Sequence, residues 1–321
     1  MKRLVKNKNI LVGGILVMCV MWCISCDTDS IYKDEQYKSV IYLLSGTENV
    51  YTESYTLNET EPVKYFSIGC GGSNPNEDEV VVTIEDDNVL LDLYNRNNFD
   101  IDISSYAKLL PSNRYEVASY VVTIPAKPKE QYVKVPVKVS PLGLSPDSIY
   151  FIPLAIKSVS RYEVNENKKN MLFRVTIEND YARQIVTTRY VKKGTITNQF
   201  NNEETLMSGD KIVQPLTKNK VRMFAGNFVQ NQTTNVDDIE RYAIVVQVND
   251  DQTIVITPYG NIDLEMLDIE KGYNIYDPVV MQGTKVHRMF FLNYRYRILN
   301  SDGTYGNWMV VRETLTRIEE D

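Results

Sequence analysis

The sequence Tyr132-Val133-Lys134-Val135-Pro136-Val137-Lys138-Val139 decides the fold class of the chain. Valine fills the odd positions, and Lys134, Pro136 and Lys138 stand between them. This period of two predicts a β-strand with one face in a hydrophobic core and the other in water. Because proline cannot donate a hydrogen bond to a neighbouring strand, Pro136 predicts an edge strand or a β-bulge.

Short runs of the same character surround this strand. They are rich in β-branched and aromatic residues and are bounded by turn formers. We expect strands near residues 39–44, 63–68, 79–84, 115–124, 149–159 and 171–177. Residues 87–94 differ, because Val89, Leu90 and Leu93 follow an aspartate at helical spacing, which predicts a short helix. Many short strands with one helical insert predict an immunoglobulin-like β-sandwich over residues 38–180.

A polar stretch from Asn179 to Thr188 predicts a domain boundary, and a second β-rich domain follows over residues 181–321. Its expected strands lie near residues 190–197, 221–229, 241–248, 253–257, 286–298 and 308–318. From Phe290 onward the even positions are apolar or aromatic and the odd positions include Arg295, so that strand buries one face. The length of this strand and of its successor favours a closed barrel or a curved β-meander over a second small sandwich. The predicted fold class is all-β.

The first residues of the chain have the character of an export signal. Lys2 and Arg3 are followed by an apolar run over residues 10–24, and polar residues begin directly after Cys26. The run is short for a membrane span and its far flank is acidic. The segment resembles a bacterial lipoprotein signal, although Cys23 stands where such signals usually carry leucine.

The resemblance implies that a signal peptide of residues 1–25 is removed and that Cys26 is acylated on its sulfur and its new amine. Two acylation points make a stable anchor, since each buried CH₂ contributes about 0.8 kcal/mol. Residues 26–37 would then form a tether between the lipid and the fold. The alternatives are an ordinary secretory signal and a membrane-spanning anchor.

Charge and cysteine content narrow the possible classes of function. The net charge is −7, and acidic and basic residues are mixed, so no clustered Lys/Arg face for nucleic acid is present. Cys19 and Cys23 would leave with the signal and Cys26 would carry lipid, which leaves Cys70 alone. We therefore predict no internal disulfide. Cys70 is expected to be a small buried residue at a strand end, with a reactive thiol as the alternative.

The residues needed for most catalytic sites are missing from the sequence. His287 is the only histidine, it is expected on the surface of a strand, and no nucleophile elbow of the G-x-S-x-G type occurs. Zinc sites built on several His or Cys ligands are excluded by count. Asp100 and Asp102 could serve glycoside hydrolysis, but the chain lacks the strand–helix repeats of a (β/α)₈ barrel. We predict no enzyme, no metal and no cofactor, with a divergent glycoside hydrolase left open.

Several motifs in the first domain follow a recognisable order. They are Leu93-Tyr94-Asn95, Leu109-Leu110-Pro111, Tyr115, Val122-Thr123-Ile124 and Phe151-Ile152-Pro153-Leu154-Ala155-Ile156. This order resembles a domain of unknown function that is common in surface lipoproteins of Bacteroidetes and also precedes endoglycosidase-type catalytic domains. The second domain resembles the lipocalin-like domain that often follows it. The residues that carry this likeness are Tyr190, Gly194-Thr195, Val221-Arg222-Met223-Phe224-Ala225-Gly226, Tyr294-Arg295-Tyr296 and Trp308.

This resemblance implies a lipoprotein of a polysaccharide-utilisation locus, anchored in the outer membrane and facing the cell exterior. Such proteins stand beside a SusC/SusD-like import pair and hold glycan without cleaving it. The alternative is a structural or assembly subunit of a surface transport or enzyme complex that acts through protein contacts.

Aromatic residues near predicted loops of the second domain are the candidates for a glycan site. Sugars stack their C–H faces on aromatic rings and offer their hydroxyls to planar polar groups. The candidate residues are Tyr259, Tyr273, Tyr276, Asp277, Tyr305 and Trp308.

Overall fold

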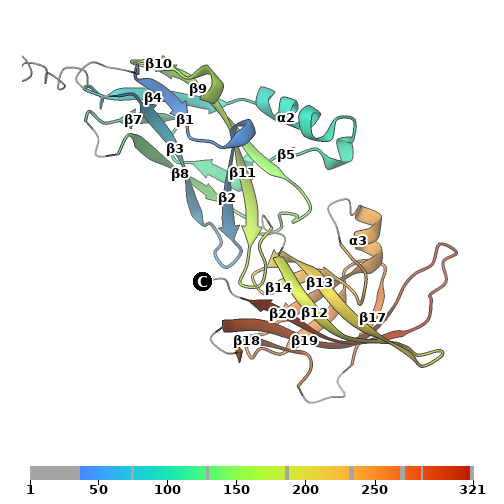
Figure 1. Ribbon diagram of the computed structural model, residues 1–321. Coiled ribbons are helices and arrows are strands. Elements are labelled where there is room, and N and C mark those ends of the chain that lie inside the picture. Colours follow the sequence, from blue (N-terminus) through green and yellow to red (C-terminus); the bar gives the residue numbers. More distant parts are fainter. Residues whose placement is uncertain are drawn as a thin grey trace, which may run out of the picture.

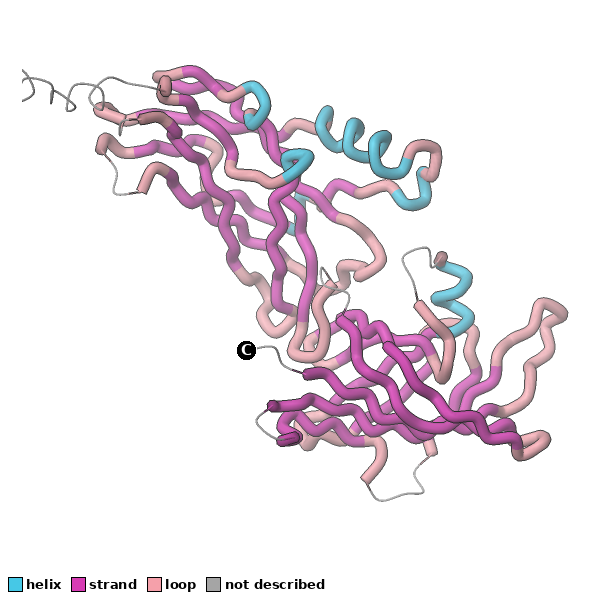
Figure 2. Tube along the Cα trace, in the orientation of Figure 1, coloured by secondary structure: helices cyan, strands magenta, loops and turns pink. Residues whose placement is uncertain are grey.

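The computed structural model describes residues 37–73, 76–127, 130–184, 188–230, 235–267, 272–282 and 285–318. The predicted signal peptide, Cys26 and all of the tether except Tyr37 lie outside these residues. Among the described residues, no helix has the length and the apolar character that a membrane span requires. Strands build both domains, which confirms the predicted all-β class (Figures 1 and 2).

The first domain is a sandwich of two sheets. Its strands are β1 (Val40–Leu43), β2 (Val50–Thr56), β3 (Val63–Gly71), β4 (Val80–Asp86), β5 (Lys108–Leu109), β6 (Tyr115–Val117), β7 (Val121–Ile124), β8 (Tyr132–Val139), β9 (Tyr150–Val159), β10 (Glu163–Val164) and β11 (Asn170–Glu178). One sheet has the order β10-β1-β3-β8-β6, and the other has the order β2-β11-β9-β4-β7 with β5 beside β9. Its helices are α2 (Val89–Phe99) and the short 3₁₀ turns Thr47–Asn49, Ile103–Ser105, Ser112–Arg114 and Glu166–Lys168.

Strand β8 has the bounds that its alternation predicts. Val135, Val137 and Val139 are buried in the core between the sheets, while Lys134 is exposed. The prediction for Pro136 needs correction, because β8 lies between β3 and β6 and is not an edge strand. The Pro136 carbonyl accepts a hydrogen bond of 3.0 Å from Ala118 N–H, just past the end of β6. The missing N–H therefore faces the short edge strand at the point where pairing stops.

Helix α2 covers the outer face of the six-stranded sheet. Leu91 packs there with Phe151 and Leu172 in a small cluster of its own. The helix continues past the predicted residue 94, and Asn95 in this extension is buried and hydrogen-bonded. Its amide oxygen accepts from Ala107 N–H at 2.8 Å, and its amide nitrogen donates to the Ala107 carbonyl at 3.0 Å. These bonds connect the end of the helix to the loop that leads into β5.

The second domain is a single sheet that curls on itself. Its elements are β12 (Thr188–Asn198), β13 (Glu203–Thr217), β14 (Lys220–Phe224), α3 (Val236–Tyr242), β15 (Ala243–Val248), β16 (Ile254–Pro258), β17 (Asp263–Met266), β18 (Ile275–Gln282), β19 (Lys285–Arg297) and β20 (Met309–Ile318). The order is β16-β15-β14-β13-β12-β20-β19-β17, with β18 on β19. Residues of β16 and β17 lie close together, so the sheet is a nearly closed barrel, as the long strands predict.

The interior of this barrel holds a buried ion pair. Lys211 on β13 donates to both carboxylate oxygens of Glu313 on β20, at 2.7 and 2.6 Å, and both side chains are at most 2% exposed. Tyr294 on β19 donates to the same carboxylate at 2.8 Å. Burial lowers the pKa of Lys211, and the carboxylate partly opposes this effect. Strand β13 was not predicted, because this inward lysine and Gly209 interrupt its apolar alternation.

The same polar group fixes the loop that follows β14. Gly226 N–H donates to the Tyr294 hydroxyl at 2.9 Å, and Lys192 donates to the Asn227 side chain at 2.9 Å. Phe228 then stacks on Tyr242 with 4.1 Å between ring centroids. Aromatic and aliphatic side chains fill the rest of the interior. The described residues thus give the barrel a packed core.

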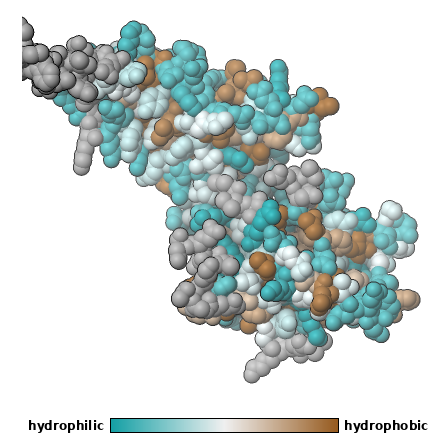
Figure 3. All heavy atoms as spheres, viewed as in Figure 1, coloured by the Kyte–Doolittle hydropathy of each residue, from teal (hydrophilic) through white to brown (hydrophobic). Residues whose placement is uncertain are grey.

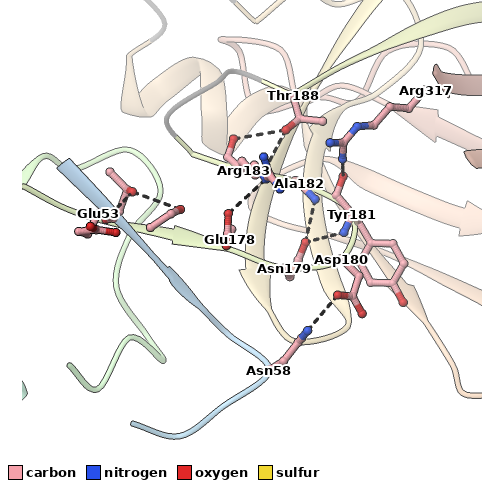
Figure 4. Close-up of polar contacts among 12 residues, drawn as sticks. Glu53, Asn58, Glu178, Asn179, Asp180, Tyr181, Ala182, Arg183, Thr188 and Arg317 are labelled. Atoms are coloured by element: carbon pink, nitrogen blue, oxygen red, sulfur yellow. Dashed lines mark hydrogen bonds and ion pairs between the residues drawn. The ribbon is translucent and has the colours of Figure 1, made fainter. Parts of the chain in front are cut away.

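Contacts across the linker join the two domains. Arg222 on β14 is fully buried and forms two hydrogen bonds, of 2.6 and 2.5 Å, with the carboxylate of Asp147 in the first domain. Figure 4 shows the linker itself, where Asn58 from the first domain donates to Asp180 at 2.9 Å. On the other side, Arg317 of β20 donates to the Tyr181 carbonyl at 3.3 Å. Side chains from both domains thus hold the linker.

The buried pair generates the first prediction. Glu313→Gln removes the charge that compensates Lys211, and we expect the free energy of unfolding to fall by about 3–5 kcal/mol. The paired replacement Lys211→Met with Glu313→Leu removes both charges and should stay close to the wild type. Urea unfolding of the three proteins measures the difference. Equal losses in both variants would show that side-chain volume, and not charge pairing, is what the barrel interior requires.

Candidate functional site

Two hairpin connections come into contact at one end of the second domain, where Gln199 N–H donates to the Trp308 carbonyl at 2.9 Å. The turn between β12 and β13 spans residues 199–202, and the connection between β19 and β20 spans residues 298–308. Both hairpins extend to the right of the barrel in Figure 1, on the side away from the marked C-terminus. Phe200 at the first tip is 82% exposed, and Tyr305 in the second connection is 43% exposed. Exposed aromatic side chains in such connections are typical of a binding surface.

Trp308 forms a platform beside these tips. The guanidinium groups of Arg295 and Arg297 lie over its ring, 4.5 and 4.6 Å from the ring centroid. Arg297 also lies over the ring of Tyr305 at 4.8 Å. Both arginines occupy outward positions of β19, and Tyr296 between them faces the core. The alternation of β19 therefore places both guanidiniums on the ring.

Carboxylates from β17 hold the arginines in place. Arg295 donates through Nε and Nη2 to Glu265 at 2.8 and 2.5 Å, and Arg297 donates through Nε to Asp263 at 2.7 Å. The antiparallel pairing of β17 with β19 sets Asp263 opposite Arg297 and Glu265 opposite Arg295. The platform is thus a stack of one indole and two guanidiniums, fixed from the side by two carboxylates.

A groove of about 260 Å³ adjoins the platform on the outer face of β12, β13 and β20. Its lining is polar except for one valine: Thr195, Thr197, Gln199, Asn202, Glu204, Val310 and Arg312. Gln199 links the groove to the platform, because its N–H donates to the Trp308 carbonyl at 2.9 Å and its side-chain oxygen accepts from Arg295 at 3.2 Å. We call Phe200, Tyr305, Trp308 and this groove the hairpin-end site.

The structure separates the residues that the sequence analysis proposed for a glycan site. Tyr305 and Trp308 share the hairpin-end site. Tyr259 lies elsewhere, with its ring 5.1 Å from the guanidinium of Arg222 at the domain junction. Tyr273 is half-buried just before β18. Asp277 lies on β18, where its carboxylate accepts from Val279 N–H at 3.0 Å.

Tyr276 is the second residue of β18, and its burial leaves little of its ring for a ligand. It is only 5% exposed, and its ring packs 4.8 Å from Phe290 and 5.0 Å from Tyr181. Burial raises its pKa to about 12. One edge of this residue lines a second hollow of about 420 Å³ beside the linker, together with Asp180, Tyr181, Lys218, Asn219, Val248, Asn249, Asp250, Gln252, Pro278 and Arg288.

The residues considered for catalysis and reactivity have ordinary surroundings. Asp102 is exposed, and hydrogen bonds from Ser104 and Ser105 lower its pKa, so it is unsuited to donate a proton. His287 is 7% exposed, which corrects the expected surface position, because the pairing of β19 with β18 and β20 covers it. Cys70 is buried and its thiol pKa is raised by burial, as expected for a packing residue. No cluster of metal-ligating side chains occurs among the described residues.

Two family models match consecutive parts of the chain. One is described as an N-terminal domain and matches residues 35–163, and the other is described as C-terminal and matches residues 169–316. The chain thus has two consecutive family-model domains, and it shares its fold with solved proteins from Bacteroides. This agrees with the resemblance seen in the sequence, while the lipid anchor and the likeness to lipocalins stay predictions.

Several solved structures share the fold over most of their length. A protein of unknown function from Bacteroides ovatus has a TM-score of 0.68 at 16% identity, with 87% of this chain and 94% of that chain covered. A multidomain protein including DUF1735, also from Bacteroides ovatus, has a TM-score of 0.66 at 16% identity and the same coverage. An auxiliary nutrient binding protein from Bacteroides thetaiotaomicron has a TM-score of 0.61 at 14% identity, with 85% and 92% covered. No curated protein matches the sequence.

The sequence analysis missed Phe200 and the carboxylate partners of Arg295 and Arg297. Phe200 stands in the polar run Asn198–Asn202, which indicates a turn and nothing more. Arg295 and Arg297 lie on the solvent-facing side of their strand, as the alternation predicts. Their carboxylate partners lie about thirty residues earlier, on a strand that was not predicted. Exposed aromatic residues inside Asn-rich turns are the signal that could have found Phe200.

Proposed function

We propose that the protein captures a glycan without cleaving it and that the hairpin-end site is where the glycan binds. The observation that carries this proposal is the Trp308 platform continuing into a polar groove through Gln199. Aromatic rings supply the stacking surface for the C–H face of a sugar, and amides, hydroxyls, carboxylates and guanidiniums supply the partners for its hydroxyls. The two kinds of surface lie side by side here, as sugar recognition requires.

The solved relatives support a binding role. The auxiliary nutrient binding protein from Bacteroides thetaiotaomicron has the same two-domain fold at a TM-score of 0.61. At 14% identity this likeness concerns the fold, so the site has to be argued from this chain's own residues. Nutrient binding on a related scaffold agrees with the platform and groove described above.

The proposed location is the outer membrane, with the body facing the cell exterior. Acylation at Cys26 would supply the anchor, and a SusC/SusD-like import pair would be the neighbour that receives the glycan. The first domain would act as spacer and docking surface, because the linker contacts and the Arg222–Asp147 pair hold the second domain firmly to it.

The second prediction concerns glycan affinity. Trp308→Ala and Tyr305→Ala should each weaken binding by about tenfold or more, because each removes part of the stacking surface. Tyr65→Ala is the matched control, since Tyr65 on β3 has an exposure of 45%, close to the 43% of Tyr305, but lies in the first domain. Calorimetry with a panel of host and plant glycans measures the affinities. If no glycan binds the wild type, the proposed function is wrong.

The third prediction concerns the anchor. Cys26→Ser should abolish incorporation of labelled palmitate and release the protein from the membrane fraction, because the acylation points are lost. Cys70→Ser is the control and should keep the label, since Cys70 is buried inside the first domain. A membrane-bound, unlabelled wild type would contradict the lipid anchor while leaving glycan binding untouched.

An assembly role is the second candidate function, and one surface favours it. Val89 and Leu93 lie four residues apart on α2, and Ile101 and Ile103 follow in the next loop, each at least 52% exposed. Figure 3 shows hydrophobic atoms gathered over this part of the first domain. Contiguous exposed apolar residues of this kind mark contacts with other proteins.

The fourth prediction separates the two functions. Val89→Ser with Leu93→Ser should abolish co-purification with a SusC/SusD-like pair if α2 is the docking surface, and should leave glycan affinity unchanged. Val81→Ser is the control, because Val81 on β4 is 39% exposed and lies away from α2. Retention of the partners in the double variant would rule out α2 as the contact.

A further inference from the structure

We infer that the hairpin-end site selects neutral glycans over glycans that carry carboxylate or sulfate groups. This inference rests on the proposed function and assigns the substrate class of the same site. The site contains three positively charged guanidinium groups, and such groups often bind anions. Their surroundings in this protein argue the opposite.

Three of the five N–H groups of Arg295 are already in use. Its Nε and Nη2 donate to Glu265, and its Nη1 donates to Gln199 at 3.2 Å. The guanidinium lies over Trp308, with 4.5 Å between its carbon and the ring centroid. An anionic group that binds the two remaining N–H groups would also meet the charge of Glu265, which offsets the gain from the new ion pair.

Arg297 is held in a similar way. Its Nε donates to Asp263 at 2.7 Å, and its guanidinium lies over both Tyr305 and Trp308. This bond uses one of the five N–H groups of Arg297, and the side chains of the ion pair are 35% and 32% exposed, so the carboxylate of Asp263 is accessible to solvent beside the rings. A negatively charged substituent on the sugar would meet this carboxylate at close range.

The side chains of the groove add as many negative charges as positive charges to the site. The groove contains one acidic and one basic side chain, and the acidic one, Glu204, accepts from the Thr197 hydroxyl at 3.4 Å. Positive and negative groups across the whole site are therefore equal in number. The positive groups are Arg295, Arg297 and Arg312, and the negative groups are Asp263, Glu265 and Glu204.

A neutral sugar fits this arrangement without displacing an ion pair. Its C–H face can rest on Trp308 and Tyr305, and its hydroxyls can donate to the free lone pairs of Asp263 and Glu265 or accept from Asn202 and Gln199. Arg295 and Arg297 keep their carboxylate partners in that complex. The electrostatic cost falls only on ligands that bring a charge of their own.

The fifth prediction uses matched pairs of polymers with the full chain purified in detergent. Dextran with dextran sulfate and galactan with polygalacturonate are two such pairs, within a broader panel of neutral polysaccharides. We expect the neutral polymers that bind to do so at least about tenfold more tightly than charged counterparts, because like charges oppose the latter. Affinity for the neutral polymer should change less than twofold between low and high salt, since screening acts on charged ligands.

A charge variant tests the cause. Asp263→Asn with Glu265→Gln leaves both arginines without carboxylates, and we expect the preference for neutral polymers to shrink or reverse. Asp210→Asn is the matched control, because it frees Arg189 on the same barrel away from the site and should change nothing. If the double variant fails to fold, the salt series on the wild type still decides the question.

The outcomes separate the two proposals. A wild type that binds the charged member of a pair as tightly as the neutral one overturns the substrate class and keeps glycan binding. A salt-sensitive affinity for the preferred glycan has the same consequence. A wild type that binds no polysaccharide of either kind overturns the proposed function itself.

Discussion

The ion pair between Lys211 and Glu313 is the constraint around which the second domain is arranged. Both side chains are at most 2% exposed, so each depends on the other and on the Tyr294 hydroxyl for its polar contacts. The same hydroxyl receives the Gly226 N–H, which fixes the loop after β14 against the barrel. Polar and aromatic side chains of the described residues pack in the interior of this barrel. The candidate site lies on its strand faces and hairpin connections.

A comparable constraint acts between the domains. Arg222 is fully buried, so its bond to Asp147 from the first domain cannot be lost without leaving an unpaired charge in the contact. Tyr259 covers the same guanidinium, which explains why an exposed tyrosine that looked like a binding residue has a structural partner instead. Tyr259, which the sequence analysis proposed as a glycan-binding residue, therefore contributes to the contact between the domains. The hairpin tips, on the far side of the barrel in Figure 1, stay available for a ligand.

How far the sequence predicts the fold depends on how local the controlling pattern is. The valines of β8 alternate without interruption, so its bounds are predicted correctly. Strand β2 was missed because its sequence, Val50–Thr56, is mostly half-buried and shows no clear alternation. Strand β13 was missed because Lys211 takes an inward position that the pattern reserves for an apolar residue. The inward position of this lysine is explained by its ion pair with Glu313, which lies about a hundred residues later in the sequence.

The candidate site follows the same rule. Trp308 and Tyr305 were identified because aromatic residues near a turn are visible in the sequence itself. Their partners were not, because Glu265 and Asp263 meet the arginines only through the pairing of β17 with β19. The strand pairing also decides the chemistry of the site. Without their carboxylate partners, the two arginines would form an anion site. With these partners, the arginines hold the aromatic rings in position before a ligand binds. A rigid, prearranged surface loses less entropy on binding, which favours weakly interacting, uncharged sugars as its ligands.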